Sequence, residues 1–190
     1  MKKFKLFIAV LCLIMVSQNV CAQKNNSAFV SSKVGLTIGT EELYGSSQKM
    51  MCDFGLEVGK FISPVVGIGL NINYANSLSY DKEYEITRKY GNDYYLAVGV
   101  NAHFRLFKQD NPKRCRVELM SGVNYSFLNK EGYIVPKVGA ELLINLGSSK
   151  NFKYVASTEI QYHKSVENSV QLNQDQFRFL IVPVGLRYEF

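Results

Sequence analysis

A chain of 190 residues with 22 Lys and Arg against 16 Asp and Glu has a formal net charge of +6. It contains no basic run interleaved with aromatic residues, which argues against a nucleic-acid-binding protein. After Val16 no apolar stretch approaches the about 20 residues that a membrane-spanning helix needs, so any membrane span must consist of strands.

The beginning of the chain has the pattern of a secretory signal peptide. Three lysines lie within the first five residues, an apolar run follows at 6–16, and small residues precede a cleavage site after Ala22. We therefore expect a signal peptide at 1–22 and one mature domain at 23–190. Removing the three lysine charges from the net +6 leaves +3, so much of the basic character belongs to the signal segment, which is expected to be cleaved off.

Eight segments of the mature chain alternate apolar and polar residues, which is the period-two pattern of β-strands with two different faces. Loop and turn residues separate the segments. The predicted strands span, in chain order, 29–40, 52–59, 66–74, 94–106, 115–127, 137–146, 152–163 and 177–190.

Alternation alone fits either a soluble barrel with its apolar face inside or a membrane barrel with that face outside. Glycine placement favours the membrane barrel, because glycine weakens a strand unless space is short and the interior of an eight-stranded barrel is narrow. Ten of the 14 glycines fall on the polar face, which is therefore expected inside. They are Gly35, Gly39, Gly55, Gly59, Gly67, Gly69, Gly99, Gly122, Gly139 and Gly185.

The polar face also carries charges of both signs in nearly equal number. Groups enclosed in a narrow lumen must find partners of opposite charge, so we expect a lumen charge network. Its members would be Lys33, Asp53, Glu57, Arg105, Arg116, Glu118, Lys137, Glu141, Lys153, Glu159, Arg178, Arg187 and Glu189.

The connections alternate in length, as the external loops and periplasmic turns of outer-membrane barrels do. The longer loops are at 41–49, 76–92, 129–133 and 164–176, and the shorter turns are near 62–64, 108–114 and 147–151. Together these features predict an all-β fold, an eight-stranded antiparallel up-and-down transmembrane β-barrel. Both chain ends would then lie on the periplasmic side.

The last predicted strand places apolar residues at every second position from Leu180 to the terminal Phe190. This ending resembles the C-terminal strand of bacterial outer-membrane β-barrels, in which an aromatic end is the signal for the barrel-insertion machinery. The resemblance assigns the insertion signal to Leu186, Tyr188 and Phe190. The mature chain as a whole is similar to the small eight-stranded barrels of the OmpX/OmpA membrane-domain type.

That resemblance implies a plugged barrel in the outer membrane of a double-membraned bacterium, with a non-enzymatic role in envelope structure or in surface interaction. Implied partners are outer-membrane lipids and lipopolysaccharide, the insertion machinery and periplasmic chaperones, and an extracellular ligand at loops 41–49, 76–92 or 164–176. A narrow small-solute channel is an alternative, although side chains fill a lumen of this size.

A second alternative is a hydrolase. His163 and Ser165 lie two residues apart on one strand face, where an imidazole can serve as base to a hydroxyl. The pair resembles the His-x-Ser of outer-membrane lipid A deacylases, but Val166 follows Ser165 where that family has Asn, and the alternation turns His163 into the lumen. No cofactor or metal site is predicted, because the two histidines lie toward opposite barrel ends. Cys52 and Cys115 fall on non-adjacent strands, so no disulfide is expected between them.

Overall fold

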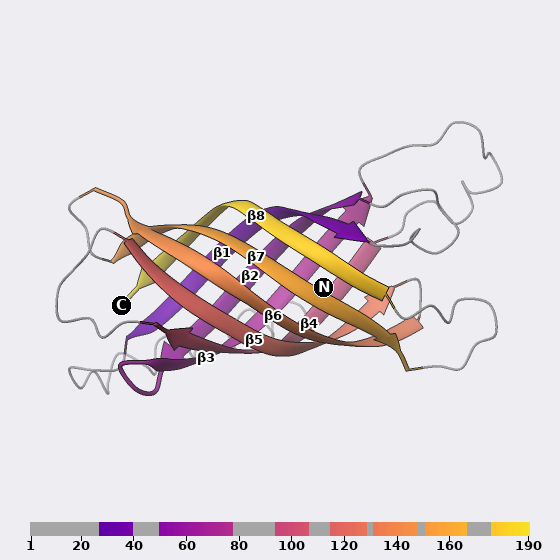
Figure 1. The fold of residues 1–190 in the computed structure, drawn as a ribbon, viewed down its shortest axis with the longest axis horizontal. Coiled ribbons are helices and arrows are strands. Elements are labelled where there is room, and N and C mark those ends of the chain that lie inside the picture. Colours follow the sequence, from indigo (N-terminus) through magenta and orange to yellow (C-terminus); the bar gives the residue numbers. More distant parts are fainter. Residues whose placement is uncertain are drawn as a thin grey trace, which may run out of the picture.

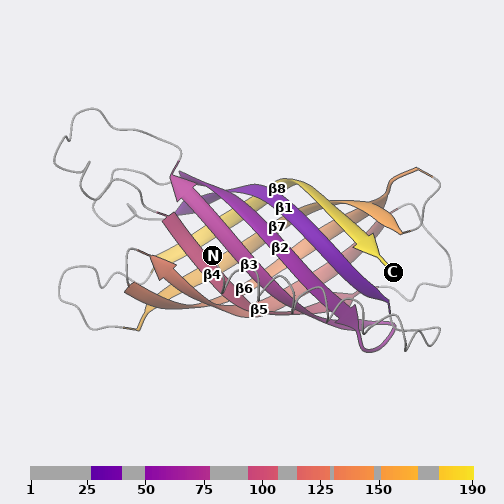
Figure 2. The ribbon, with the colours of Figure 1, turned by 180° about the vertical axis from the view of Figure 1, so that it is seen from behind.

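The computed structural model describes residues 27–39, 50–77, 94–106, 115–128, 131–147, 151–166 and 176–190. They form one closed barrel of eight antiparallel strands in sequence order, with β8 hydrogen-bonded to β1 (Figures 1 and 2). The strands are β1 (Ala28–Gly39), β2 (Met50–Phe61), β3 (Val66–Ser77), β4 (Tyr94–Arg105), β5 (Cys115–Leu128), β6 (Glu131–Asn145), β7 (Phe152–Ser165) and β8 (Gln176–Glu189). The predicted signal peptide at 1–22 and most of the predicted loops lie outside the described residues.

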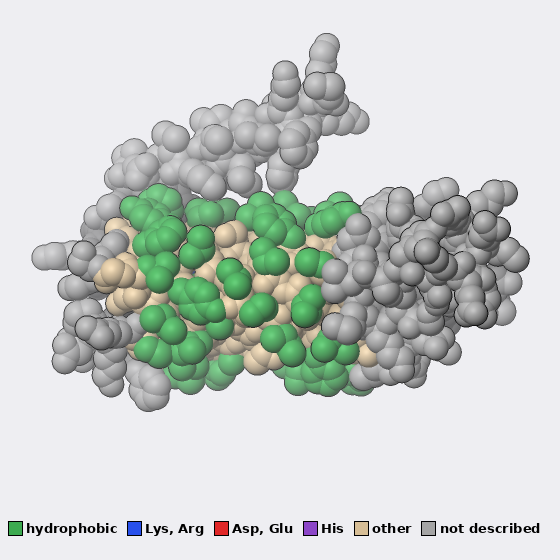
Figure 3. Space-filling view, turned by 90° about the horizontal axis from the view of Figure 1, so that it is seen from above, with side chains coloured by type: hydrophobic (Ala, Val, Ile, Leu, Met, Phe, Trp, Pro, Cys, Tyr) green, Lys and Arg blue, Asp and Glu red, His purple; other side chains and the backbone are tan. Residues whose placement is uncertain are grey.

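The predicted inside and outside faces are confirmed along most strands. On β3, Leu70 is 64% exposed and its neighbour Asn71 only 4%, so the apolar side chains point out and the polar ones point in. Figure 3 shows one side of the barrel, on which hydrophobic side chains cover the described wall and no charged group is visible. The described residues include no helix long and apolar enough to cross a membrane. A continuous apolar exterior of this extent is typical of contact with lipid or with another protein.

The connection between β2 and β3 is the predicted tight turn at Ser63 and Pro64. The Ser63 Oγ accepts a hydrogen bond of 2.9 Å from the backbone N–H of Val66, and the N–H of Ile62 donates to the Val66 carbonyl at 2.9 Å. A side-chain oxygen that caps its own turn in this way is the usual reason for serine at such positions.

The predicted start of the sixth strand is wrong. β6 begins at Glu131, and Gly132 pairs with Phe127 of β5, so the expected loop at 129–133 shrinks to the residues between Leu128 and Glu131. The alternation was hidden because Tyr133 and Val135 are apolar although they point inward, each with 0% exposure. Likewise β3 and β7 extend to Ser77 and Ser165, which shortens the loops predicted at 76–92 and 164–176.

The second correction concerns β8. Leu180 and Val182 were expected on the outer face, yet both are buried inside with 2% exposure, whereas Ile181 points outward. The register of β8 shifts at the same place against both neighbours, between Val34 and Leu36 on one side and between Val155 and Ser157 on the other. One extra residue near Pro183 therefore bulges out of the ladder and reverses the alternation. Proline, which has no N–H to donate, is tolerated at such a bulge.

A lumen filled by ion pairs is the candidate functional site

The centre of the lumen is a fully buried ion-pair cluster built on Arg187 of β8. Its Nη1 donates to Glu118 Oε2 at 2.7 Å and its Nη2 to Glu141 Oε2 at 2.5 Å. All three side chains have 0% exposure. Lys33 of β1 pairs with the other oxygen of Glu141 and lies 3.5 Å from Glu57 Oε2. These ion pairs thus connect, through the lumen, strands that do not pair with each other, such as β8 with β5 and β6.

A second group of ion pairs lies toward the end of the barrel at which the short turns are found. Arg105 Nε donates to Glu118 Oε1 at 3.2 Å, and Arg116 Nη2 lies 2.7 Å from the same oxygen. Arg116 also pairs with Glu189, and Lys153 Nζ lies 3.5 Å from Glu189 Oε2. In this layer the carboxylates of Glu118 and Glu189 pair with three cations. Because Glu118 also pairs with Arg187, it links this layer to the central cluster.

The remaining charged residues assigned to the lumen also lie inside but are more loosely connected. Lys137 Nζ is 3.7 Å from Glu159 Oε2. Asp53 accepts a hydrogen bond of 3.3 Å from the Thr37 hydroxyl, and among the described residues it has no ion-pair partner. Arg178 is 1% exposed, with its Nη1 4.0 Å from the sulfur of Met51. The structure therefore joins eleven of the thirteen assigned side chains in ion pairs, while Asp53 contacts Thr37 and Arg178 lies beside Met51.

Sequence reasoning did not assign His103 to the network, although it lies on the predicted inner face. Its Nε2 is 2.7 Å from Glu57 Oε1, and its Nδ1 is 3.6 Å from Glu141 and 3.8 Å from Glu118. In the described part of the chain, the ligand atoms of His103, Glu118 and Glu141 come within 4.8 Å of one another, a spacing that a metal ion could use. The guanidinium of Arg187 already holds both carboxylates, so the positive charge that a metal would bring is supplied by the protein. The absence of a metal stays a prediction.

An aromatic floor, formed by Phe29 and Phe61, closes the turn end of the lumen. Both rings have 0% exposure, and their centroids are 5.6 Å apart. The Arg105 guanidinium lies 3.4 Å from the Phe61 ring centroid and that of Arg187 4.5 Å from Phe29, so each arginine stacks on a ring as well as pairing with a carboxylate. Sequence reasoning missed this layer.

Glycines on the neighbouring strands make room for the aromatic floor. A Cβ at Gly59 would lie 2.3 Å from the Phe29 ring, and one at Gly67 would lie 2.9 Å from the Phe61 ring. Contacts this short are far below van der Waals separation, so no other residue fits without displacing a ring. The clustering of Gly59, Gly67 and Gly69 was therefore a signal in the sequence for large inward side chains nearby.

The other half of the lumen, toward the long-loop end, is lined by an apolar cluster of Met51, Ala75, Ala97, Tyr133 and Val135. His163 lies in this half with 1% exposure, its Nε2 3.2 Å from Gln161 Oε1. The Tyr133 ring centroid is 6.5 Å from the His163 ring centroid. The backbone of Ser165 pairs with Tyr133, but the side chain of Ser165 lies outside the described part of the structure. The imidazole thus lies on the lumen side of the wall.

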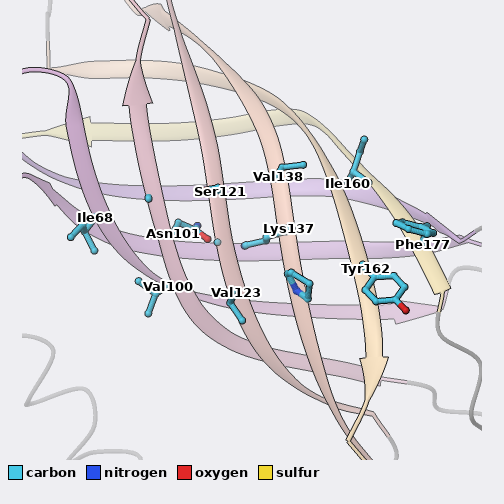
Figure 4. Close-up of a pocket in the computed structure, with 13 residues that line it drawn as sticks. Ile68, Val100, Asn101, Ser121, Val123, Lys137, Val138, Ile160, Tyr162 and Phe177 are labelled. Carbon is cyan, nitrogen blue, oxygen red and sulfur yellow. The ribbon is translucent and has the colours of Figure 1, made fainter.

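A small internal cavity lies among the described inward side chains. It is lined by Lys33, Glu57 and Asn71, among others, and offers a water-sized molecule about 10 Å³. A larger hollow of about 650 Å³ lies on the outer wall between two rows of residues from neighbouring strands (Figure 4). One row contains Ile68, Ala102, Ser121, Val138 and Ile160, and the other contains Val100, Val123, Pro136, Tyr162 and Phe177. The short side chains of Ala102 and Ser121 leave the hollow open.

The residues assigned to the insertion signal lie on the outer face after the bulge. Leu186, Tyr188 and Phe190 are 41%, 40% and 61% exposed, and the rings of Tyr188 and Phe190 meet edge to face at 4.9 Å. Cys52 on β2 and Cys115 on β5 are both free thiols.

No protein-family model matches this sequence, and no curated protein matches it significantly. Solved structures match its fold over most of the chain. Neisserial surface protein A has a TM-score of 0.60 at 10% sequence identity, covering 87% of this chain and 97% of that one. The N-terminal β-barrel domain of Pseudomonas aeruginosa OprF has a TM-score of 0.52 at 15% identity, covering 88% and 100%.

Ail, the attachment invasion locus protein of Yersinia pestis, was solved with the heparin analogue sucrose octasulfate. It has a TM-score of 0.54 at 15% identity, covering 87% of this chain and 99% of that one. At such low identities the likeness concerns architecture, and it agrees with the strand number, the closure and the apolar outer wall found in this chain. The protein therefore has the fold of the small eight-stranded outer-membrane β-barrels.

Proposed function

We propose that this protein is a plugged barrel of the bacterial outer membrane, which acts without catalysis in envelope structure or in surface interaction through its long loops. The observation that carries the proposal is the described interior of the barrel, in which fully buried ion pairs and an aromatic floor occupy the lumen. A small interior packed with side chains is no path for solutes. The parts of the barrel that can interact with other molecules are then its outer wall and its loops.

The outer wall supports the membrane location. Exposing side chains such as Leu70, Val123 and Val138 to water would cost roughly 1.5–3 kcal/mol for each side chain left unburied. These three are 64%, 52% and 56% exposed, so the protein needs an apolar surrounding of the kind that a bilayer provides. The terminal Tyr188 and Phe190 on the same face are the contacts that we assign to the insertion machinery.

Conductance measurements in planar lipid bilayers test the plug directly. We expect the reconstituted wild-type barrel to show no stepwise current, because buried ion pairs join β1, β2, β5, β6 and β8 across the described part of the lumen. A Phe61→Ala, Arg105→Ala double variant, which removes one stacked pair from the turn end, serves as a positive control for partial opening. Stable ohmic steps from the folded wild-type barrel would establish the channel alternative instead.

Binding by the loops needs a separate experiment. Ail was solved with a heparin analogue, so heparin is the first probe to use. We expect vesicles that carry the full barrel to bind heparin, and a variant with loops 41–49 and 78–93 replaced by short turns to fold but bind less. Equal binding by both proteins, or no binding by either, would argue against these loops as a surface for sulfated polysaccharides.

The lipid A deacylase alternative is less favoured, because the His163 imidazole points into the lumen and lipid lies on the opposite side of the wall. Mass spectrometry of lipid A from cells that express the folded barrel checks it, with Ser165→Ala as the matched variant. We expect identical lipid A from both strains. Loss of an acyl chain that depends on Ser165 would show that the protein is an enzyme.

A further inference from the structure

The small internal cavity lies midway through the lumen and is lined mainly by polar side chains. They include Lys33, Asp53, Glu57, Asn71, Lys137 and Glu159. Its volume of about 10 Å³ is close to the minimum of roughly 10–15 Å³ that one water molecule needs. Two buried oxygen atoms of its lining residues, Glu57 Oε2 and Asn71 Oδ1, make no hydrogen bond within the described structure.

The hydrogen bonds of the neighbouring Asn side chains show that both of these oxygen atoms are acceptors that still lack a hydrogen bond. The Glu57 carboxylate only accepts hydrogen bonds, so Asn101 must present its NH₂ group, which donates to Glu57 Oε1 at 2.9 Å. The Oδ1 of Asn101 is then an acceptor, and it accepts from Nδ2 of Asn71 at 3.0 Å. Asn71 Oδ1 is left as an acceptor without a hydrogen bond, and Glu57 Oε2 has only the Lys33 ammonium, at 3.5 Å.

A ligand for this site must therefore be small and able to donate two hydrogen bonds. A second cation is disfavoured because the Lys33 ammonium already lies 3.5 Å from Glu57 Oε2, and Lys137 also lines the cavity. Water meets the requirement, since it donates twice and can accept from a lysine, which gives the about three hydrogen bonds usual for buried water.

We propose that one water molecule is bound in this cavity and donates hydrogen bonds to Glu57 Oε2 and Asn71 Oδ1. It completes the polar network at the place where protein groups leave two acceptors unsatisfied, each of which would otherwise cost about 1–3 kcal/mol. The site does not depend on the role of the loops or on lipid, so the proposed function can fail while the water site remains.

Buried side chains flank the cavity, so the water should exchange slowly with bulk solvent. Toward the turn end lie the central ion pairs and the aromatic floor of Phe29 and Phe61, both with 0% exposure. On its other sides Leu180 and Val182, turned inward by the β8 bulge, line the cavity with 2% exposure each.

Nuclear magnetic resonance of the barrel in lipid nanodiscs tests the proposal through cross-relaxation between water and the side-chain NH₂ groups of Asn71 and Asn101. We expect wild type to show water cross-peaks at both amides, with the sign of a long-lived bound molecule. Asn71→Leu replaces the acceptor by an apolar group of similar size, and the cross-peak at Asn101 should disappear. Asn124→Leu, another inward asparagine that does not line the cavity, should leave it unchanged.

The wild-type spectrum decides the question even if the leucine variant fails to fold. Absence of cross-peaks at both amides in wild type would overturn the proposal, as would a cross-peak at Asn101 that survives in the folded Asn71→Leu variant. Amide shifts of Asn71 that titrate with sodium or potassium concentration would assign the site to a monovalent cation and equally reject water.

Discussion

Removal of the arginine at the centre of the lumen is the sharpest test of how this barrel is stabilised. In Arg187→Met, a side chain of similar length keeps the packing on Phe29 but leaves Glu118 and Glu141 without their shared partner. Arg187 donates to them at 2.7 and 2.5 Å, and hydrogen bonds to charged groups contribute about 1.5–3 kcal/mol each. Breaking a buried ion pair by removing one partner costs about 3–5 kcal/mol, which agrees with that sum. We expect a loss within this range.

The free energy of unfolding can be measured by urea titration of the refolded barrel in lipid vesicles, with the folded fraction read from heat-modifiable gel migration. A double variant that combines Arg187→Met with Glu141→Gln is the matched control, because it removes a carboxylate that has lost one of its two cations while Lys33 still faces Glu57, and it should recover part of the loss. If Arg187→Met unfolds at the same urea concentration as wild type, the ion-pair cluster is not what stabilises the lumen, and our account of the plug fails.

Three further changes test other parts of the structure. Gly59→Ala should destabilise the barrel by about 1–3 kcal/mol, because the added methyl group overpacks against the Phe29 ring. Adding Phe29→Leu should restore part of the lost stability. A Gly59→Ala barrel as stable as wild type in the same urea titration would contradict the close approach of Gly59 and Phe29. Tyr154→Phe removes the hydroxyl that donates to the Pro183 carbonyl at the β8 bulge and should cost about 0.5–1.5 kcal/mol, measured in the same way. Phe190→Ala should lower the amount of folded barrel in the outer membrane of living cells while leaving refolding in vitro nearly unchanged; equal effects in both settings would mean a purely structural role.

The sequence predicted the fold and the two faces because strand alternation has a period of two and the lumen is mostly polar. It failed where inward residues are apolar. Tyr133 and Val135 hid the beginning of β6, and Leu180 and Val182 continued an apolar line through the β8 bulge. A bulge changes the phase by one residue without altering composition, so only the register against β1 and β7 reveals it.

The charged members of the lumen were predictable, but their partners were not. Arg187 meets Glu118 and Glu141 from β5 and β6, neither of which pairs with β8, at separations of 69 and 46 residues along the chain. Alternation indicates that a side chain points inward, but it does not give the position along the barrel axis at which that side chain meets a partner from another strand. For the same reason His103 was placed on the inner face but not in the central cluster.

The fit between glycines and large inward side chains has an evolutionary consequence. Phe29 occupies space that Gly59 leaves free on a neighbouring strand, and Phe61 does the same at Gly67. The Glu57 carboxylate lies 2.3 Å from where a Cβ of Gly69 would be. The summed side-chain volume of each such pair is therefore constrained, rather than the volume at each position alone. A substitution that adds bulk at Gly59 then requires a smaller residue at position 29 and also a shift of the Ile68 carbonyl oxygen, which lies 2.6 Å from the same Cβ position. In diverging descendants of this chain, these positions should change as coupled pairs, and the outward residues between them should drift independently.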